Sequence, residues 1–374
     1  MGITITSVLT SCILNSLLIL VLCIVFRRNS VMYRIGPGCM IVFYVAVILR
    51  MFVPLEFPYT YSVRIEDVLT PARRALEQPV APQAEGFTVW DLMMLVWGVG
   101  IVGIVAYKTI VYRRVNRCLS CLSGKTWGEV RDRCRVSIGP VPRMERLKVV
   151  YSEQCSSPVL IGHLNPILVL PPVEYEEEQY QYILMHELMH LKNRDIVWKV
   201  LIELLCTGFW WNPVFWLLKK ELFQLIEMRN DMQMVTRLSG RERIGYMECL
   251  KNTAVQLGQR DAFYGVGFSR SDYQSLKRRM ELIAGYRKFS RRRQAAAGLW
   301  VCALLAVSTM VIFEPYSYDH GEGEAVTEDN TYLVENGESY DVYYDGKYAF
   351  TTEDLTPFPG VKIYKTNEEA EAND

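Results

Sequence analysis

Four long apolar runs constrain this chain more than any other feature of its sequence. They cover residues 3–26, 35–54, 90–112 and 294–313. An α-helix needs about 20 apolar residues to cross the ~30 Å hydrocarbon core of a bilayer. Half of the 374 residues are hydrophobic and only 22% are charged, which is unusual for a soluble globular protein. The sequence therefore predicts a mainly α-helical, polytopic membrane protein with about four transmembrane helices.

Basic residues cluster beside three of these runs. One cluster follows the first run, another follows the third, and the last precedes the fourth: Arg27, Arg28, Arg34, Lys108, Arg113, Arg114, Arg117, Arg287, Lys288, Arg291, Arg292 and Arg293. Short cytoplasmic loops of membrane proteins are rich in Lys and Arg. We therefore expect residues 113–293 in the cytoplasm, with the amino terminus and the carboxy-terminal tail outside. Because the positive charges follow the first run instead of preceding it, this run is predicted to be an uncleaved anchor.

Acidic residues concentrate in the tail. Residues 314–374 hold 16 acidic and 3 basic side chains, whereas residues 1–313 hold 38 basic and 25 acidic ones. Charge that segregates along a hydrophobic chain indicates a membrane protein, and we expect no direct contact with nucleic acid.

The tail also carries hairpin signals. Asn336-Gly337 and Asp345-Gly346 are turn dipeptides between aromatic and β-branched runs, so we predict a small β-meander over 331–351. The acidic flanks 315–330 and 366–374 are expected to be disordered.

Three short motifs carry little functional weight. The GxGxxG match at 98–103 lies inside an apolar run without a preceding strand, which favours close helix packing over a cofactor site. Ser123-Gly124-Lys125-Thr126 lacks the first glycine of a phosphate loop. Cys118 and Cys121 form a CxxC pair without a second pair, which is a weak signal for zinc.

The sequence His186-Glu187-Leu188-Met189-His190 has a specific chemical meaning. Residues i and i+4 share one face of a helix, so His186 and His190 can bind one metal ion, with Glu187 offset toward a water molecule there. Acidic residues precede this segment, and residues 182–191 contain no Gly or Pro, which favours a helix. The alternative is that these are two ordinary histidines in a chance match.

Catalytic zinc needs a third protein ligand and an open position for water. The remaining histidines are His163 and His320, of which the second is expected outside. Glu227 is the better candidate, because Glu227 and Asp231 are spaced i and i+4 on another predicted helix. One carboxylate could bind the metal while Asp231 hydrogen-bonds a ligand imidazole. The alternative for this pair is a solvated helix face.

Residues 196–218 are almost apolar enough to form another crossing. A single crossing would separate His190 from Glu227, and a bend within the segment leaves arms too short for two crossings. We expect a re-entrant or interfacial hairpin, or packing within the protease domain. Lys199 and Glu203 are spaced to pair with each other on one helix face.

A series of segments resembles the BlaR/MecR-type membrane zinc metallopeptidases. The segments run in order as SPVLIG (157–162), NPILVLP (165–171), HELMHLKNRD (186–195), WNPVFW (211–216) and EMRND (227–231). Their order and spacing, from about residue 1 to 313, are far more specific than HExxH alone.

The resemblance implies a gluzincin-like α+β zinc protease domain at 113–293 of a multi-pass protein of the bacterial cell membrane. In that family pattern His186, His190 and Glu227 hold Zn²⁺, Glu187 is the catalytic base, and Asp231 supports a ligand from behind. It also implies a signalling role, in which an external signal leads to loss of a cytoplasmic winged-helix repressor. The predicted function is hydrolysis of peptide bonds in that repressor, in the protein itself, or in both.

The chain departs from the beta-lactam receptors of this family after the fourth run. Its 61 remaining residues contain no SxxK motif, so we predict no penicillin-binding sensor domain here. The segment 159–170 is predicted to be an edge strand that aligns an extended substrate. Tyr246 and His163 are candidate oxyanion donors, and self-cleavage near Arg291–Arg293 would be a switch. The alternative functions are a processing or quality-control protease and a non-catalytic receptor that keeps zinc for structure.

Overall fold

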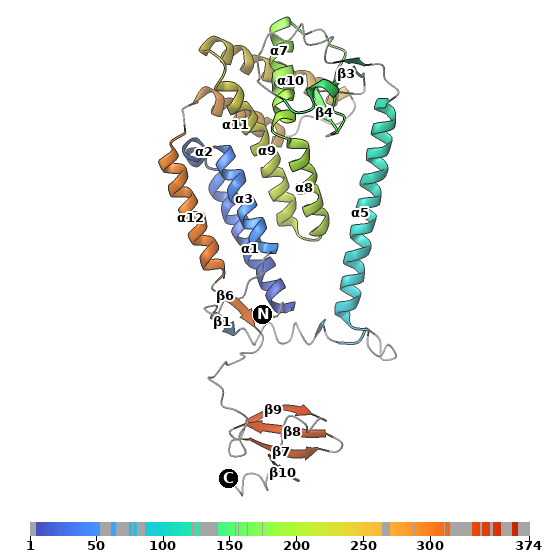
Figure 1. The fold of residues 1–374 in the computed structure, drawn as a ribbon, viewed down its shortest axis with the longest axis vertical. Coiled ribbons are helices and arrows are strands. Elements are labelled where there is room, and N and C mark those ends of the chain that lie inside the picture. The colour runs from blue at the N-terminus through green and yellow to red at the C-terminus, as the bar shows by residue number, and fades with distance from the viewer. Residues whose placement is uncertain are drawn as a thin grey trace. The chain divides into compact units, whose positions relative to one another are not determined.

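The computed structural model shows a mostly helical chain (Figure 1). It divides into two compact units, Met1–Tyr316 (unit 1) and Ser317–Asp374 (unit 2). The structure describes residues 5–52, 61–64, 75–76, 78–80, 87–120, 124–126, 141–153, 155, 157–162, 164–173, 175–263, 270–286, 289–309, 311–314, 331–336, 339–344, 347–352 and 361–365. The predictions for His163, His320, Cys121 and the two tail flanks fall outside these residues.

Two apolar helices pack side by side in unit 1. They are α1 (Ile5–Phe26) and α3 (Pro37–Phe52), joined by the short α2 (Asn29–Ile35) (Figure 1). Phe26 meets Tyr44 edge to face, with ring centroids 5.4 Å apart. The run predicted as one helix over 35–54 is broken at Gly36, whose φ of 86° is favourable for glycine.

A 32-residue helix, α5 (Val89–Ser120), carries the third apolar run. Thr88 and Asp91 form a capping box at its start: the Asp91 carboxylate accepts hydrogen bonds from the Thr88 backbone N–H at 2.9 Å and from its hydroxyl at 2.7 Å. The helix continues beyond the predicted end at residue 112, because its basic last turns contain no Gly or Pro.

Helix α5 also contains the membrane-span candidate within the described residues. Val89–Cys118 is long and apolar enough to cross a bilayer, whereas Ser11–Phe26 and Pro37–Phe52 are apolar but shorter. The fourth apolar run forms α12 (Arg291–Thr309), which begins with three arginines. The number of crossings stays a prediction from the sequence.

The fourth run ends earlier than predicted. Helix α12 stops at Thr309, and Val311–Glu314 forms strand β6, which pairs in parallel with β1 (Tyr61–Arg64). Val311, Ile312 and Phe313 are β-branched or aromatic and favour a strand once a partner strand is available. The predicted helix end at residue 313 is therefore wrong.

The segment 196–218 forms most of a helical hairpin. Helix α8 (Asp195–Gly208) and helix α9 (Pro213–Val235) pack together. Asn212 caps α9 by accepting a 3.0 Å hydrogen bond from the Val214 backbone N–H, and Pro213 occupies the first helical position. Phe215 and Leu218 on α9 are completely buried in the unit 1 core, whereas Val200, Leu201 and Leu204 on α8 are more than half exposed.

Helix α8 connects α5 to the rest of unit 1. The Trp97 indole donates to the Gly208 carbonyl at 2.7 Å, and the Trp210 indole donates to the Trp97 carbonyl at 3.3 Å. The Lys108 ammonium on α5 donates to the Glu203 carboxylate on α8 at 2.7 Å. Glu203 is also paired with a lysine of α9, Lys219.

The glycines of α5 allow this close contact at one position. A Cβ atom at Gly100 would lie 2.6 Å from the Trp210 ring, whereas Gly98 and Gly103 have nothing within 4 Å. We expect Gly100→Ala to destabilise the protein by about 1–3 kcal/mol, because the rigid indole must move. Thermal unfolding in detergent measures the effect, with Gly98→Ala and Gly103→Ala as matched controls. Equal behaviour of all three variants would contradict this packing.

A small sheet and three further helices complete unit 1. The strand order is β2-β3-β5-β4, with β4 antiparallel to β5 at the edge. The strands are β2 (Lys125–Thr126), β3 (Lys148–Tyr151), β4 (Val159–Ile161) and β5 (Ile167–Leu170), and the helices are α7 (Glu177–Lys192), α10 (Gly240–Phe263) and α11 (Arg270–Ala284), with a 3-10 turn η1 (Met144–Arg146). The prediction of one edge strand over 159–170 is wrong, since a turn at Gly162 makes β5 an inner strand.

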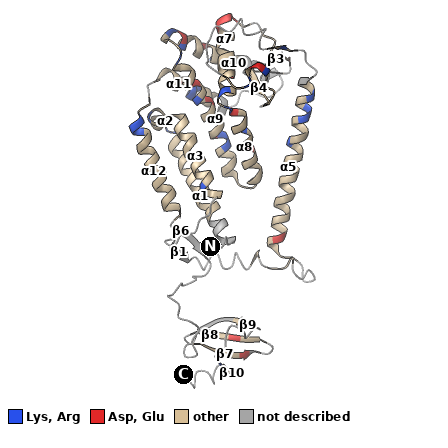
Figure 2. Cartoon of the chain, in the orientation of Figure 1, with Lys and Arg blue, Asp and Glu red and all other residues tan. Residues whose placement is uncertain are grey.

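Charge is unevenly distributed over the helices of unit 1. The basic residues of α5 and α12 lie at the end of these helices that is level with α11 and α7 (Figure 2). The acidic residue in the first turn of α5, Asp91, lies at the opposite end. Both helices therefore have their positive ends on the side that holds the small sheet.

Unit 2 is a four-stranded sheet in the order β10-β7-β8-β9. Strands β7 (Thr331–Asn336), β8 (Ser339–Tyr344) and β9 (Lys347–Thr352) form an antiparallel meander over the segment in which one was predicted. Strand β10 (Lys362–Tyr364) adds in parallel to β7. The sheet buries Leu333 and Val342.

Candidate active site

Helix α7 holds the HExxH motif. Glu177 and Glu178 occupy its first turn, where negative charge is favourable, and the helix ends at Lys192. His186 and His190 lie on one face, with ring centroids 4.9 Å apart, and both are buried. A possible metal ligand atom from each of His186, Glu187 and His190 lies within 4.8 Å of the others.

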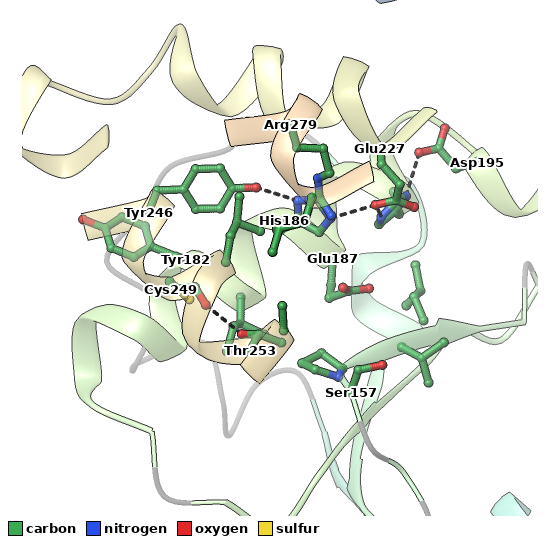
Figure 3. A pocket seen from close by; sticks show the side chains of 18 of the residues that line it. Ser157, Tyr182, His186, Glu187, Asp195, Glu227, Tyr246, Cys249, Thr253 and Arg279 are labelled. Carbon is green, nitrogen blue, oxygen red and sulfur yellow. Dashed lines mark hydrogen bonds and ion pairs between the residues drawn. The ribbon is translucent and has the colours of Figure 1, made fainter. Parts of the chain in front are cut away.

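Helix α9 brings Glu227 to the two histidines. Its Oε2 atom lies 3.3 Å from His186 Nε2 and 3.4 Å from His190 Nε2 (Figure 3). Residues 41 and 37 positions apart in the chain thus meet because α7 and α9 pack together. The structure brings Glu227 and both histidines of the sequence prediction to one point.

The imidazole of His190 is held from behind by Asp195. Asp195 Oδ2 lies 2.8 Å from His190 Nδ1 and also accepts a 2.6 Å hydrogen bond from the Asn230 amide. Asp195 is 1% exposed and is paired with Arg229 as well. A carboxylate at Nδ1 favours a proton on Nδ1 and fixes the ring so that Nε2 faces Glu227.

Sequence reasoning missed the position of Asp195. It follows His190 by five residues, which on a continuous helix would place it off the histidine face. Arg194 has a left-handed backbone, with φ 55°, and this turn between α7 and α8 brings Asp195 back to the imidazole. The available signal was the Asn193-Arg194-Asp195 turn directly after the motif.

The imidazole of His186 has a different support. Its Nδ1 atom lies 2.9 Å from the Tyr246 hydroxyl on α10, and that hydroxyl donates to Asp231 Oδ1 at 2.6 Å. Asp231 Oδ1 itself is 3.4 Å from His186 Nδ1, longer than an ordinary hydrogen bond. Tyr246 therefore lies between Asp231 and the imidazole, and its role as an oxyanion donor stays a prediction.

Asp231 is completely buried and receives a charge partner from α11. Arg279 donates from Nε to Asp231 Oδ2 at 2.6 Å and from Nη2 to Asp231 Oδ1 at 2.8 Å. Such two-point contacts between guanidinium and carboxylate are strong and directional. Nothing in the sequence around Arg279 indicated this contact.

Lys199 pairs with Glu227, not with Glu203. Its ammonium donates to Glu227 Oε1 at 3.2 Å, while Glu203 pairs with Lys108 and Lys219. The predicted i, i+4 pair is wrong because tertiary packing offers each side chain a partner from another helix. The two carboxylate oxygens of Glu227 thus have different partners: Oε1 accepts from the Lys199 ammonium, and Oε2 faces the two imidazoles.

The site attracts positive charge. Burial favours the neutral form of His190, yet the nearby carboxylates, above all Glu227, raise the pKa of its imidazole to about 10. Burial also favours the neutral form of Glu227, but His190, His186 and Arg279 hold its pKa well below its usual range. Two convergent Nε2 atoms and an ionised carboxylate are a donor set that fits a divalent cation such as zinc.

A cavity of about 370 Å³ opens beside these residues. Figure 3 shows Glu187, His186 and Glu227 together with Ser157, Tyr182 and Thr253 around it. One wall is formed by the edge strand β4, and apolar side chains line much of the remainder: Val159, Leu160, Ile183, Leu250 and Leu276. The cavity is large enough for an amino-acid side chain of a substrate.

The helical fold and this His-Glu-His site together define a metallopeptidase-type protein. The profile of the BlaR1 peptidase M56 family matches residues 7–283, and the chain belongs to this family. The family implies a metal, and the resemblance found in the sequence is confirmed.

Two curated relatives show how far the similarity extends. The methicillin resistance mecR1 protein of Staphylococcus aureus (strain Mu50 / ATCC 700699) is 23% identical over 232 residues, which cover 59% of this chain and 39% of the relative. The regulatory protein BlaR1 of Bacillus licheniformis is 25% identical over 219 residues, covering 57% and 35%. The similarity thus spans little more than a third of the relatives' length.

Proposed function

We propose that this chain is a multi-pass zinc peptidase of the bacterial cell membrane. It would hydrolyse peptide bonds of a cytoplasmic repressor, of itself, or of both, in response to an external signal. The observation that carries the proposal is that Glu227 Oε2 lies 3.3 Å from His186 Nε2 and 3.4 Å from His190 Nε2, beside Glu187. The regulatory names of its relatives support the signalling part.

The chemistry requires one group besides the protein side chains. His186, His190 and Glu227 would hold zinc, which polarises a scissile carbonyl and lowers the pKa of water when it is bound. Glu187 would take a proton from the attacking water and later deliver it to the leaving amine. Asp195 and Tyr246 would keep both imidazoles in place throughout.

Strand β4 supports a peptide as substrate. It is the edge strand of the small sheet and lines the cavity next to Glu187, so its backbone could pair with an extended chain. Self-cleavage near Arg291–Arg293 would first require local unwinding, because these residues form the first turn of α12. An extended segment of a repressor meets no such obstacle.

The charge distribution supports a cytoplasmic peptidase. The basic ends of α5 and α12 lie on the side of unit 1 that holds the site, and basic residues favour the cytoplasmic side of membranes. Unit 2 would then lie outside and take part in sensing.

The proposal can be tested on the full chain in detergent. We expect about one zinc ion per chain, cleavage of a purified winged-helix repressor or of the chain itself, loss of cleavage after chelation, and recovery with added zinc. Absence of zinc, or cleavage that persists after chelation, would overturn the proposal. Bound zinc without any cleavage, whether or not an extract of cells exposed to the external signal is added, would favour a non-catalytic receptor.

A further inference from the structure

Helix α11 reaches the metal site through a chain of three hydrogen-bonded side chains. Arg279 donates twice to Asp231, the Tyr246 hydroxyl donates to Asp231 at 2.6 Å, and the same hydroxyl lies 2.9 Å from His186 Nδ1. Asp231 and Tyr246 are 0% and 1% exposed, so water does not compete for these contacts. The chain therefore joins α11, α9, α10 and α7.

The direction of each hydrogen bond follows from the number of protons available. A hydroxyl has one proton, and Tyr246 donates it to Oδ1 of Asp231. Its oxygen can then only accept from His186, so the imidazole proton must be on Nδ1. The Nε2 atom of His186 lies 3.3 Å from Glu227 Oε2, at the position where a metal ion would take the place of its proton.

Arg279 holds this chain of hydrogen bonds in place at its outer end. Without the guanidinium, the buried carboxylate of Asp231 would lose two hydrogen bonds and its charge partner. Asp231 would then no longer be held where it accepts the hydrogen bond of the Tyr246 hydroxyl. The ring of His186 would lose its fixed support at Nδ1, and its Nε2 atom would no longer be held toward the metal site.

Building on the proposed function, we infer that Arg279 and Tyr246 are positioning residues of the metal centre. They hold the ring of His186 in the orientation that presents Nε2 to the metal site, through Asp231. His190 is positioned independently by Asp195 and Asn230, so the two ligands rest on separate supports. The support of His186 comes from α9, α10 and α11, whereas that of His190 comes from α8 and α9.

Zinc affinity of the purified full chain tests this inference directly. We expect Arg279→Lys and Tyr246→Phe each to raise the zinc dissociation constant about 10- to 100-fold, as loss of an outer hydrogen bond to a ligand does. Competition with a chromophoric chelator measures the constant. The matched control is Lys277→Gln on the same helix. Lys277 pairs with Glu281 at 3.8 Å, and its replacement should leave the zinc dissociation constant within about twofold.

The double variant distinguishes one chain from two separate effects. Arg279 and Tyr246 act on His186 through the same chain of hydrogen bonds. The double variant, Arg279→Lys with Tyr246→Phe, should therefore have a zinc dissociation constant close to that of the single variant that binds zinc more weakly. Multiplied effects would overturn a shared path. Unfolding of the metal-free proteins is measured in parallel, because a purely structural role would lower the unfolding temperature and leave the zinc constant of the folded protein unchanged.

The outcomes separate this inference from the function on which it rests. An unsubstituted protein without zinc would overturn the proposed function together with the inference. Zinc in the unsubstituted protein, with unchanged affinity in both single variants, would overturn the inference alone. Weakened zinc binding in both variants, with a normal control, would support it.

Discussion

Glu187→Gln should lower the rate of peptide hydrolysis by about 10²–10⁴-fold while the protein still binds zinc. Glutamine has nearly the same shape but cannot accept a proton from water, and the proposed metal donors of His186, His190 and Glu227 are untouched. The measurements are the cleavage rate of the repressor or of the chain itself, and the zinc content of the same preparation.

The matched control for this variant is Glu178→Gln. Glu178 lies in the first turn of the same helix α7 and is exposed, so both cleavage and zinc content should stay normal. Undiminished hydrolysis by Glu187→Gln would rule out Glu187 as the proton acceptor. Loss of zinc from this variant would instead identify Glu187 as a metal ligand.

Glu227→Ala is expected to weaken zinc binding by more than the about 10- to 100-fold effect of losing an outer contact. The change removes the oxygen that lies 3.3–3.4 Å from both Nε2 atoms, and it leaves the Lys199 ammonium without its carboxylate. A cation left beside the site would further oppose a metal ion. Hydrolysis should be lost together with the metal.

Zinc content and chelator competition of Glu227→Ala are compared with those of Lys220→Gln. Lys220 is exposed on the same helix α9, and its replacement should leave zinc binding unchanged. Zinc bound normally by Glu227→Ala would contradict its assignment as the third ligand. Zinc lost equally from the control would show that α9 as a whole had been disturbed.

The sequence predicted the parts of the site that depend on helix periodicity. His186 and His190 share a face because they are four residues apart on α7, and Glu227 and Asp231 share one on α9 for the same reason. For both pairs, the prediction that the segment is a helix is enough to place the two residues on one face. Packing of α7 against α9 then brings the two faces together.

Contacts that depend on tertiary structure were not predictable in this way. Asp195 reaches His190 only because Arg194 adopts a left-handed turn, and Arg279 reaches Asp231 only because α11 packs on α9. The i, i+4 rule wrongly paired Lys199 with Glu203, since a weak local pair gives way to partners from neighbouring helices. Local rules thus found the side chains that converge at the candidate site and missed most of the side chains that hold them in place.

Helix α8 has a mechanical consequence for a sensor. Near its end it is hydrogen-bonded to α5 through the Gly208 carbonyl and the Glu203 carboxylate, and its first residue, Asp195, is hydrogen-bonded to His190. Fourteen residues of α-helix form a stiff rod about 21 Å long. Because this rod is stiff, a displacement of α5 would be carried along α8 to Asp195 and to its contact with His190.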